Sequence, residues 1–346
     1  MIFAVKKLRI LIAMALGCGL ALACAALAAH GEGQNQQPAG LQPGPRATPL
    51  NITWLYVQPD TNSQKISQIQ IGREMVVNQE SGSWLDVEAN TDAEELQNQS
   101  DQPMVGGQAA APPLSGWMQA KGIVEETTPD GDQILMGAAA NEEALASNPQ
   151  GPANAAQAAM LLYTRLYQMF PHSPLAPEAR WRAGDIQWQI EKADNAPPPG
   201  SASQNTFFRQ LMDESALKKV IKLYPRTRWA ALAAYDLIDN KLCGDWQNSA
   251  NCPEKEAQIY ERYAAEFPDG PRTAHALYEA VYRMAVLTDM FAANGDKKKS
   301  GLAREQAGKL DAQLKAHFAG SDYTWRAGAL IYKLDQGIPV FSAGLE

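Results

Sequence analysis

Histidine and the short motifs of common enzyme classes are scarce in this sequence of 346 residues. Its four histidines, at positions 30, 172, 275 and 317, lie far apart and form no paired metal-binding spacing. No Gly-rich phosphate loop and no Gly-x-Ser-x-Gly nucleophile elbow occurs. The acidic groups at 130–132 and 142–143 offer fewer oxygens in register than a calcium loop needs. We therefore expect no metal, no cofactor and no catalytic residues, and predict that the protein is not an enzyme.

Basic charge is also in short supply, with 30 Lys and Arg residues against 38 Asp and Glu residues. The imbalance is uneven, because residues 48–127 carry a net charge of −8 whereas residues 156–346 carry +1. Phosphate neutralisation by Lys and Arg supplies most of the affinity for nucleic acid, and this chain has no basic stripe. Nucleic acid is therefore excluded as a partner.

The first 29 residues have the pattern of a secretion signal. Lys6, Lys7 and Arg9 form a positive start, and an uncharged run from 10 to 29 ends in small residues. A retained membrane anchor is the alternative, since the apolar run approaches spanning length. A lipoprotein signal at Cys24 is a third interpretation. We expect an exported protein of the periplasm or cell envelope, which touches the membrane only through this segment if it is retained or lipidated.

Cysteine is nearly absent after the signal segment, where only Cys243 and Cys252 remain. In an exported protein, an isolated pair separated by eight residues is most simply a disulfide. A tetrahedral metal site would need about four ligands, and no histidine lies near either cysteine. A catalytic cysteine would need a histidine base, which nothing in the sequence favours.

The N-terminal third is organised as a linker followed by strands. Residues 30–48 are rich in Gln, Pro and Gly and predict a flexible linker. Short strand-like runs at 52–57, 66–71, 75–78 and 84–87 are separated by turn signals, and the pattern resumes at 116–118 and 123–124. These runs predict a small β-barrel over residues 49–127, with a polar insertion at 91–113 in one hairpin loop.

Three stretches of this segment resemble the signature motifs of bacterial SH3-type (SH3b) domains. They are "LYVQPD" at 55–60, "GSWLDV" at 82–87 and "GWMQAKGIV" at 116–124, and they occur in the order that the family has. The resemblance implies an SH3-like barrel in which grooves between loops bind peptides. The candidate ligand-binding residues are Trp54, Tyr56, Trp84 and Trp117, although two or three of these aromatics would also suffice to fill a small core.

From residue 152 onward, after a predicted linker at 128–151, the sequence becomes helical and one motif recurs. "FPHSPLAPEARW", "YPRTRWAALAAY", "FPDGPRTAHALY" and "FAGSDYTWRAGA" begin at Phe170, Tyr224, Phe267 and Phe318. An aromatic opens each copy, Ser, Thr or Gly stands fourth, and Ala stands tenth. We interpret the aromatic as the end of one helix, the fourth residue as the cap of the next, and the alanine as a point of close helix packing.

This motif resembles the boundary between tetratricopeptide (TPR) repeats, in the long-helix form of periplasmic Tol–Pal-associated proteins and outer-membrane assembly lipoproteins. The resemblance implies TPR-like helical repeats over 152–340. It also places Cys243 and Cys252 on either side of a long loop within one helical hairpin, which a disulfide would hold together.

The sequence thus predicts a multidomain α and β protein, a small SH3-like barrel followed by an all-α repeat array. We expect a non-catalytic scaffold that binds protein partners of the cell envelope through the repeats. Recognition of peptidoglycan or wall peptides by the barrel is the alternative. A cell-wall hydrolase is the third and least favoured hypothesis.

Overall fold

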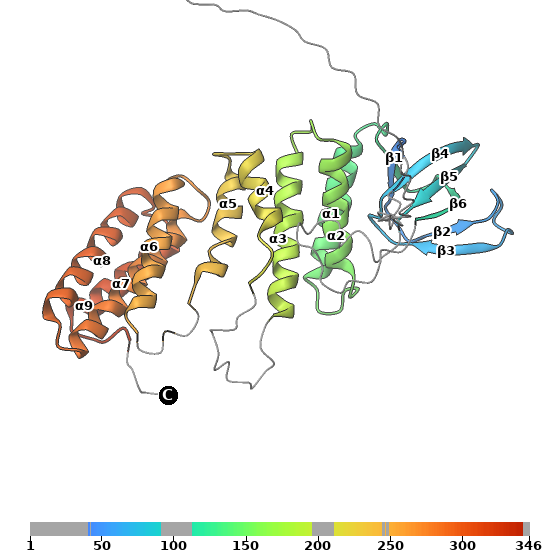
Figure 1. Cartoon of the computed structure of the whole chain (residues 1–346). Helices are drawn as coiled ribbons and strands as arrows, with labels where there is room; N and C mark the ends of the chain where they lie inside the picture. Colours follow the sequence, from blue (N-terminus) through green and yellow to red (C-terminus); the bar gives the residue numbers. More distant parts are fainter. Residues whose placement is uncertain are drawn as a thin grey trace, which may run out of the picture. The chain divides into compact units, whose positions relative to one another are not determined.

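The computed structural model describes residues 41, 43–90, 113–195, 211–243, 246 and 249–341. The predicted signal segment and the predicted insertion, except Pro113, lie outside these residues. Within them an antiparallel sheet precedes a series of α-helices, so the predicted order of a β region followed by an α region is confirmed (Figure 1). None of the helices in these ranges has the apolar stretch that crossing a bilayer requires.

The sheet is antiparallel, and its strands pair in the order β3-β2-β6-β5-β4-β1-β7. In β5 (Trp84–Ala89), alternation places Leu85, Val87 and Ala89 on the buried face of the sheet. There they pack with Leu55 and with the fully buried Met118. The pairings between described residues do not join β3 to β7, so the sheet is open at its two ends. The strands are β1 (Arg46–Pro49), β2 (Thr53–Tyr56), β3 (Lys65–Ile69), β4 (Met75–Ser81), β5 (Trp84–Ala89), β6 (Leu114–Gln119) and β7 (Ile123–Glu125).

The sheet begins earlier than the sequence predicted. Residues 46–48 were expected to belong to the linker at 30–48, but they form most of β1, which lies between β4 and β7. Ala47 and Thr48 are fully buried. Both side chains are small and one is polar, so this strand lacks the run of large apolar residues by which the other strands were recognised.

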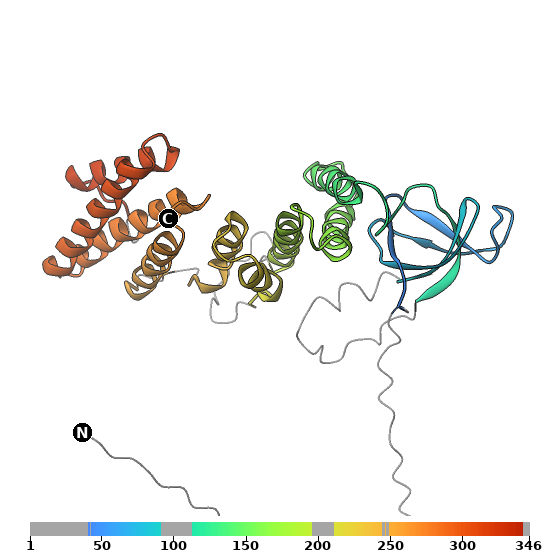
Figure 2. The ribbon, with the colours of Figure 1, turned by 90° about the horizontal axis from the view of Figure 1, so that it is seen from above.

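The helical region contains α1 (Gly131–Ala146), α2 (Ala155–Met169), α3 (Ala176–Asp194), α4 (Ser215–Leu223), α5 (Arg228–Asp236), α6 (Asn251–Glu266), α7 (Thr273–Ala293), α8 (Lys297–His317) and α9 (Asp322–Asp335), with a short 3-10 turn η2 (Asp239–Lys241). Sequence neighbours lie side by side, as between α1 and α2 or α7 and α8, and α3 also contacts α5, as α7 contacts α9 (Figures 1 and 2). Helices therefore pack both against a neighbour in the sequence and, at α3–α5 and α7–α9, against the next helix but one.

The recurring motif falls at the helix boundaries that the sequence predicted. Its leading aromatics are the C-terminal caps of α2, α4, α6 and α8, and its alanines at 179, 233, 276 and 327 are fully buried. The predicted caps of the following helices are confirmed in two copies. Thr227 accepts a hydrogen bond from the Ala230 amide at 3.3 Å, and Ser321 accepts one from the Tyr323 amide.

The other two copies differ at the cap position. Ser173 lies two residues before the N-cap of α3, and its hydroxyl donates to Oδ2 of Asp132, in α1, at 2.5 Å. Gly270 has no side chain to offer, and Arg272 is the N-cap of α7. The N-caps at these two joints therefore lie two residues after the predicted cap position.

The segment predicted as a linker at 128–151 is largely helix, which corrects that prediction. Helix α1 occupies 16 of its residues and buries Leu135 and Ala139 against α2. The same core includes Val124 of β7, so the last strand and the first two helices share one hydrophobic cluster. At the start of α1, Asp130 adopts a left-handed conformation (φ 54°) and its carbonyl accepts the first helical hydrogen bond.

A second contact between sheet and helices surrounds Gly72. Its φ of +79° favours glycine, and a Cβ there would lie 2.6 Å from Cβ of Leu161 in α2. The nearly buried Arg165 of α2 donates from Nε to the Gly72 carbonyl at 3.1 Å and pairs with Glu74 at 3.4 Å. The turn before β4 is thus fixed to α2 by close packing and by a buried guanidinium.

Candidate functional site

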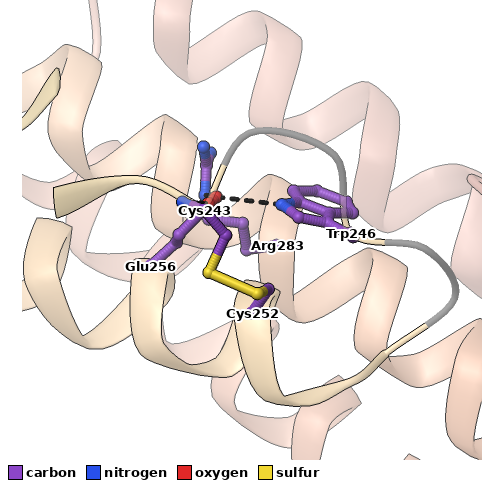
Figure 3. Close-up of a disulfide and its surroundings, with 5 residues drawn as sticks. All are labelled: Cys243, Trp246, Cys252, Glu256 and Arg283. Atoms are coloured by element: carbon purple, nitrogen blue, oxygen red, sulfur yellow. Dashed lines mark hydrogen bonds and ion pairs between the residues drawn. A yellow bond between two sulfur atoms is a disulfide. The ribbon is translucent and has the colours of Figure 1, made fainter. Parts of the chain in front are cut away.

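The two cysteines that follow the predicted signal segment lie at disulfide distance, as predicted (Figure 3). Their Cα atoms are 5.9 Å apart, and the bridge joins the segment after η2 to the first turn of α6. Glu256 of α6 lies beside Cys243. Its Oε1 accepts a hydrogen bond from the Cys243 amide at 2.8 Å, and its Oε2 accepts one from Nε1 of Trp246 at 3.2 Å.

Glu256 is also half of a buried ion pair that the sequence did not predict. Nε of Arg283, in α7, donates to Oε2 of Glu256 at 2.8 Å, and the two side chains are 8% and 2% exposed. Arg283 further pairs with Glu279 at 2.5 Å and stacks 4.6 Å from the ring centre of Tyr260. Each charge has compensating partners, so this network holds the bridged segment against α6 and α7 and leaves no polar group aimed at a ligand.

The four aromatic residues proposed as ligand-binding lie on the face of the sheet opposite its core. Trp54, Tyr56, Trp84 and Trp117 alternate with buried residues of their strands, and none belongs to the sheet's hydrophobic cluster. Tyr56 is the cross-strand partner of Trp117, and its ring meets that of Trp84 edge-on at 5.5 Å. The structure therefore brings these three together on neighbouring strands.

Charged groups border this aromatic face. Trp54 is 37% exposed, and Nζ of Lys65 lies 4.3 Å from its ring centre. Asp86 stands opposite Trp117 in the β5–β6 register, and burial raises the pKa of its carboxyl group. The face offers rings for stacking and a carboxylate for a cationic or amide group, which suits binding of a peptide.

A second group of aromatic residues links four helices. Trp181 of α3 stacks on Trp229 of α5, with ring centres 5.4 Å apart. The Tyr235 hydroxyl, also in α5, is 2.8 Å from Nδ1 of His275 in α7, and His275 stacks on Tyr323 of α9 at 4.4 Å. We call these five residues the aromatic row. All five are partly exposed, and the row runs from α3 through α5 and α7 to α9.

Only part of this row could be found from the sequence. Trp181 and Tyr235 hold the twelfth position of the recurring motif, which is aromatic in three of its four copies. Trp229 and Tyr323 hold the sixth position in two copies. The stacked rings hold different motif positions, since Trp181 is twelfth and Trp229 sixth, so it is the packing of α3 on α5 and of α7 on α9 that brings the rings together.

Acidic groups lie beside the row at the α3–α5 contact. Nε1 of Trp181 donates to Oδ2 of Asp236 at 3.1 Å. Burial, with a contribution from the charge of Asp185, raises the pKa of Asp236 to about 7, while Arg272 acts in the opposite direction. Burial also raises the pKa of Asp185. Asp236 therefore changes charge near neutral pH.

One part of the row has the order of a catalytic triad. The Tyr235 hydroxyl contacts Nδ1 of His275, and Nε2 of His275 is 3.3 Å from Oε1 of Glu279. A tyrosine nucleophile would have to ionise, but burial raises the pKa of Tyr235 far above its usual range. We therefore interpret these contacts as packing and orientation. No set of three or more His, Cys, Asp or Glu side chains among the described residues is arranged to hold a metal ion.

Comparisons with known proteins give no family for this chain. No protein-family model matches the sequence, and no curated protein matches it. Among solved structures, the chain is similar to a "DHF79 filament" chain with 15% sequence identity, over 58% of this chain and 96% of that one. The TM-score is 0.21, so this likeness supports no conclusion about fold or function.

Proposed function

We propose that this protein is an exported, non-catalytic scaffold of the bacterial cell envelope that binds a partner protein through its helical region. In this proposal the helices form TPR-like repeats and the sheet is an SH3-like domain. The aromatic row carries the proposal. Trp and Tyr are enriched at protein interfaces because they offer large contact area and a polar group at a small entropic cost.

The arrangement of the row supports an extended partner. Stacked helical pairs present long continuous surfaces. The row spans four helices as a stacked pair, Trp181 and Trp229, and a series of contacts from Tyr235 through His275 to Tyr323, and Trp229 and Tyr235 both belong to α5. The row also has charged neighbours of both signs, since Asp236 and Arg272 lie beside Trp181 and Tyr235. A partner segment that stacks on the rings would meet hydrogen-bonding and charged groups at their edges, which gives specificity.

Quantitative capture from envelope extract tests this proposal. The wild-type protein and the double variant Trp229→Ala/Tyr323→Ala serve as bait, and Leu223→Ser, at a residue 53% exposed on α4, is the matched control. We expect a protein captured by the wild type and the control that is lost from the double variant. The purified partner should then bind the double variant about 30-fold or more weakly, as interface anchors require. Equal binding of all three forms would contradict the proposal.

Binding of a wall peptide by the sheet is a second candidate, favoured by the outward placement of Tyr56, Trp84 and Trp117. Co-sedimentation with peptidoglycan sacculi distinguishes it. Trp84→Ala should reduce sedimentation of the full chain, whereas Ile52→Ser, at a residue 50% exposed, should not. Release of soluble muropeptides by the wild-type protein would instead support a hydrolase and overturn both proposals.

A further inference from the structure

Helix α9 carries the largest exposed aromatic residues of the described helices. Trp325 is 66% exposed and Tyr332 is 63% exposed. They are seven residues, or two helical turns, apart and therefore lie on one face. Gly328 and Ala329 stand midway between them, so the face has the pattern aromatic, small, aromatic.

Earlier in the chain, the corresponding positions receive a following helix. Tyr332 stands fourteen residues after Phe318, as Gly184 stands fourteen after Phe170. A Cβ at Gly184 of α3 would lie 3.2 Å from the Leu217 side chain of α4.

Trp325 likewise corresponds to Ala231 of α5, since each stands seven residues after the leading aromatic of its motif copy. Ala231 is 2% exposed, and its carbonyl accepts a hydrogen bond from the hydroxyl of Tyr263, in α6, at 3.0 Å. The two exposed aromatics of α9 thus occupy the surface on which α3 and α5 bind the next helix.

We propose that this face of α9 pairs with the same face of a second copy of this chain, in an antiparallel and two-fold symmetric contact. Such a contact requires a self-complementary surface. Reversing the helix about the point between Gly328 and Ala329 brings Trp325 of each copy onto Tyr332 of the other. The small residues at the centre allow the two helices to approach closely.

The charges on this face are complementary in the same arrangement. Asp322 and Lys333 are eleven residues, about three turns, apart and lie on one edge of the face, where Asp322 also pairs with Arg326 of its own helix at 2.6 Å. Their midpoint is one residue from that of the aromatic pair. In the antiparallel pair, Lys333 of each copy therefore comes within one turn of Asp322 of the other.

The surface area that the aromatic rings would bury in this contact indicates a weak dimer. A Trp or Tyr side chain can bury roughly 150–250 Å². With about two-thirds of each ring exposed, the four rings of the pair supply roughly 500 Å², less than half of the roughly 1,200 Å² of a stable interface. The remainder must come from the flanking residues, and we expect a dissociation constant in the micromolar range.

Sedimentation velocity of the purified full chain, from about 1 to about 200 µM, tests the proposal. Gly328→Gln blocks the close approach without disturbing the fold, since a Cβ there meets nothing within 4 Å. Gly301→Gln in α8, where a Cβ also meets nothing, is the matched control. We expect dimerisation of the wild type and the control, and at least about tenfold weaker dimerisation of Gly328→Gln.

Cross-linking examines the orientation. Ala329→Cys lies beside the two-fold axis and should form a disulfide-linked dimer on oxidation, whereas Leu302→Cys, at a residue 56% exposed on α8, should not. A monomer at every concentration would overturn the proposal. Equal effects of the two glutamine variants, or equal cross-linking of the two cysteine variants, would overturn it as well.

Discussion

Replacement of Glu256 by alanine should destabilise the helical region severely, because this carboxylate is 2% exposed and has three donors. The substitution leaves Arg283 buried without its main partner, and it removes the acceptor of the Cys243 amide and of the Trp246 indole. Breaking a buried ion pair in this way costs about 3–5 kcal/mol. Arg283 keeps its contact with Glu279, so we expect about 3 kcal/mol, at the lower end of that range.

Urea unfolding followed by tryptophan fluorescence, with the disulfide intact, measures this cost. Glu254→Ala, two residues earlier in α6 at an exposed position, should change the free energy of unfolding by less than about 0.5 kcal/mol. The double variant Glu256→Ala/Arg283→Met should recover more than half of the loss, because it removes the uncompensated charge. A cost below about 1 kcal/mol for Glu256→Ala, or additive effects of the two substitutions, would refute the reasoning.

Three further predictions concern the same region. The pKa of Asp236 is raised to about 7, so its carboxylate opposes folding above the unfolded pKa of about 4. Asp236→Asn should therefore stabilise the protein at pH 8, by up to about 4 kcal/mol, and give no gain at pH 3.5. An equal gain in thermal melts at both pH values would be inconsistent with this prediction. Replacing both Cys243 and Cys252 by serine opens a ten-residue loop and should cost about 2–3 kcal/mol in urea unfolding, whereas an unchanged midpoint would show that Glu256 alone holds the segment. Ala276→Leu, at a fully buried position of α7, should lower the free energy of unfolding by about 1–3 kcal/mol through overpacking. Ala274→Leu, at a half-buried neighbouring position, should lower it less. The reverse order would contradict close packing at the recurring alanine.

The helix boundaries were predictable because one local pattern encodes them. An aromatic residue, usually followed by proline, ends each even-numbered helix from α2 to α8, and Thr227 or Ser321 caps the next. These effects act over a few residues and are therefore visible in sequence. The six strands from β2 to β7 were likewise recognised from alternation and turn residues.

Elements whose burial depends on distant partners were not predictable in the same way. Strand β1 contributes Ala47 and Thr48 to a core that the other strands build, and its own sequence resembles the linker before it. Helix α1 has a weakly amphipathic sequence and is held by α2 and β7. Only the fold shows which of its small residues face a partner.

The candidate sites were also predictable only where a local sequence pattern places their residues. Alternation alone places Trp54, Tyr56 and Trp84 on a common face once the strands are known. The aromatic row requires the contacts between alternate helices, since Trp181 and Trp229, or His275 and Tyr323, are 48 residues apart in sequence. The Glu256–Arg283 pair likewise depends on the packing of α6 against α7, for which the sequence carries no local signal.

Site-specific photo-cross-linking in living cells tests the scaffold proposal most directly. A photoreactive amino acid replaces Trp229 or Tyr323 in the aromatic row and, as controls, Leu223 on α4 or Leu302 on α8, which are more exposed than the row positions. The proposal predicts that one envelope protein cross-links at both row positions and at neither control. Cross-links to that protein in equal yield at all four positions, or none at the row, would contradict it.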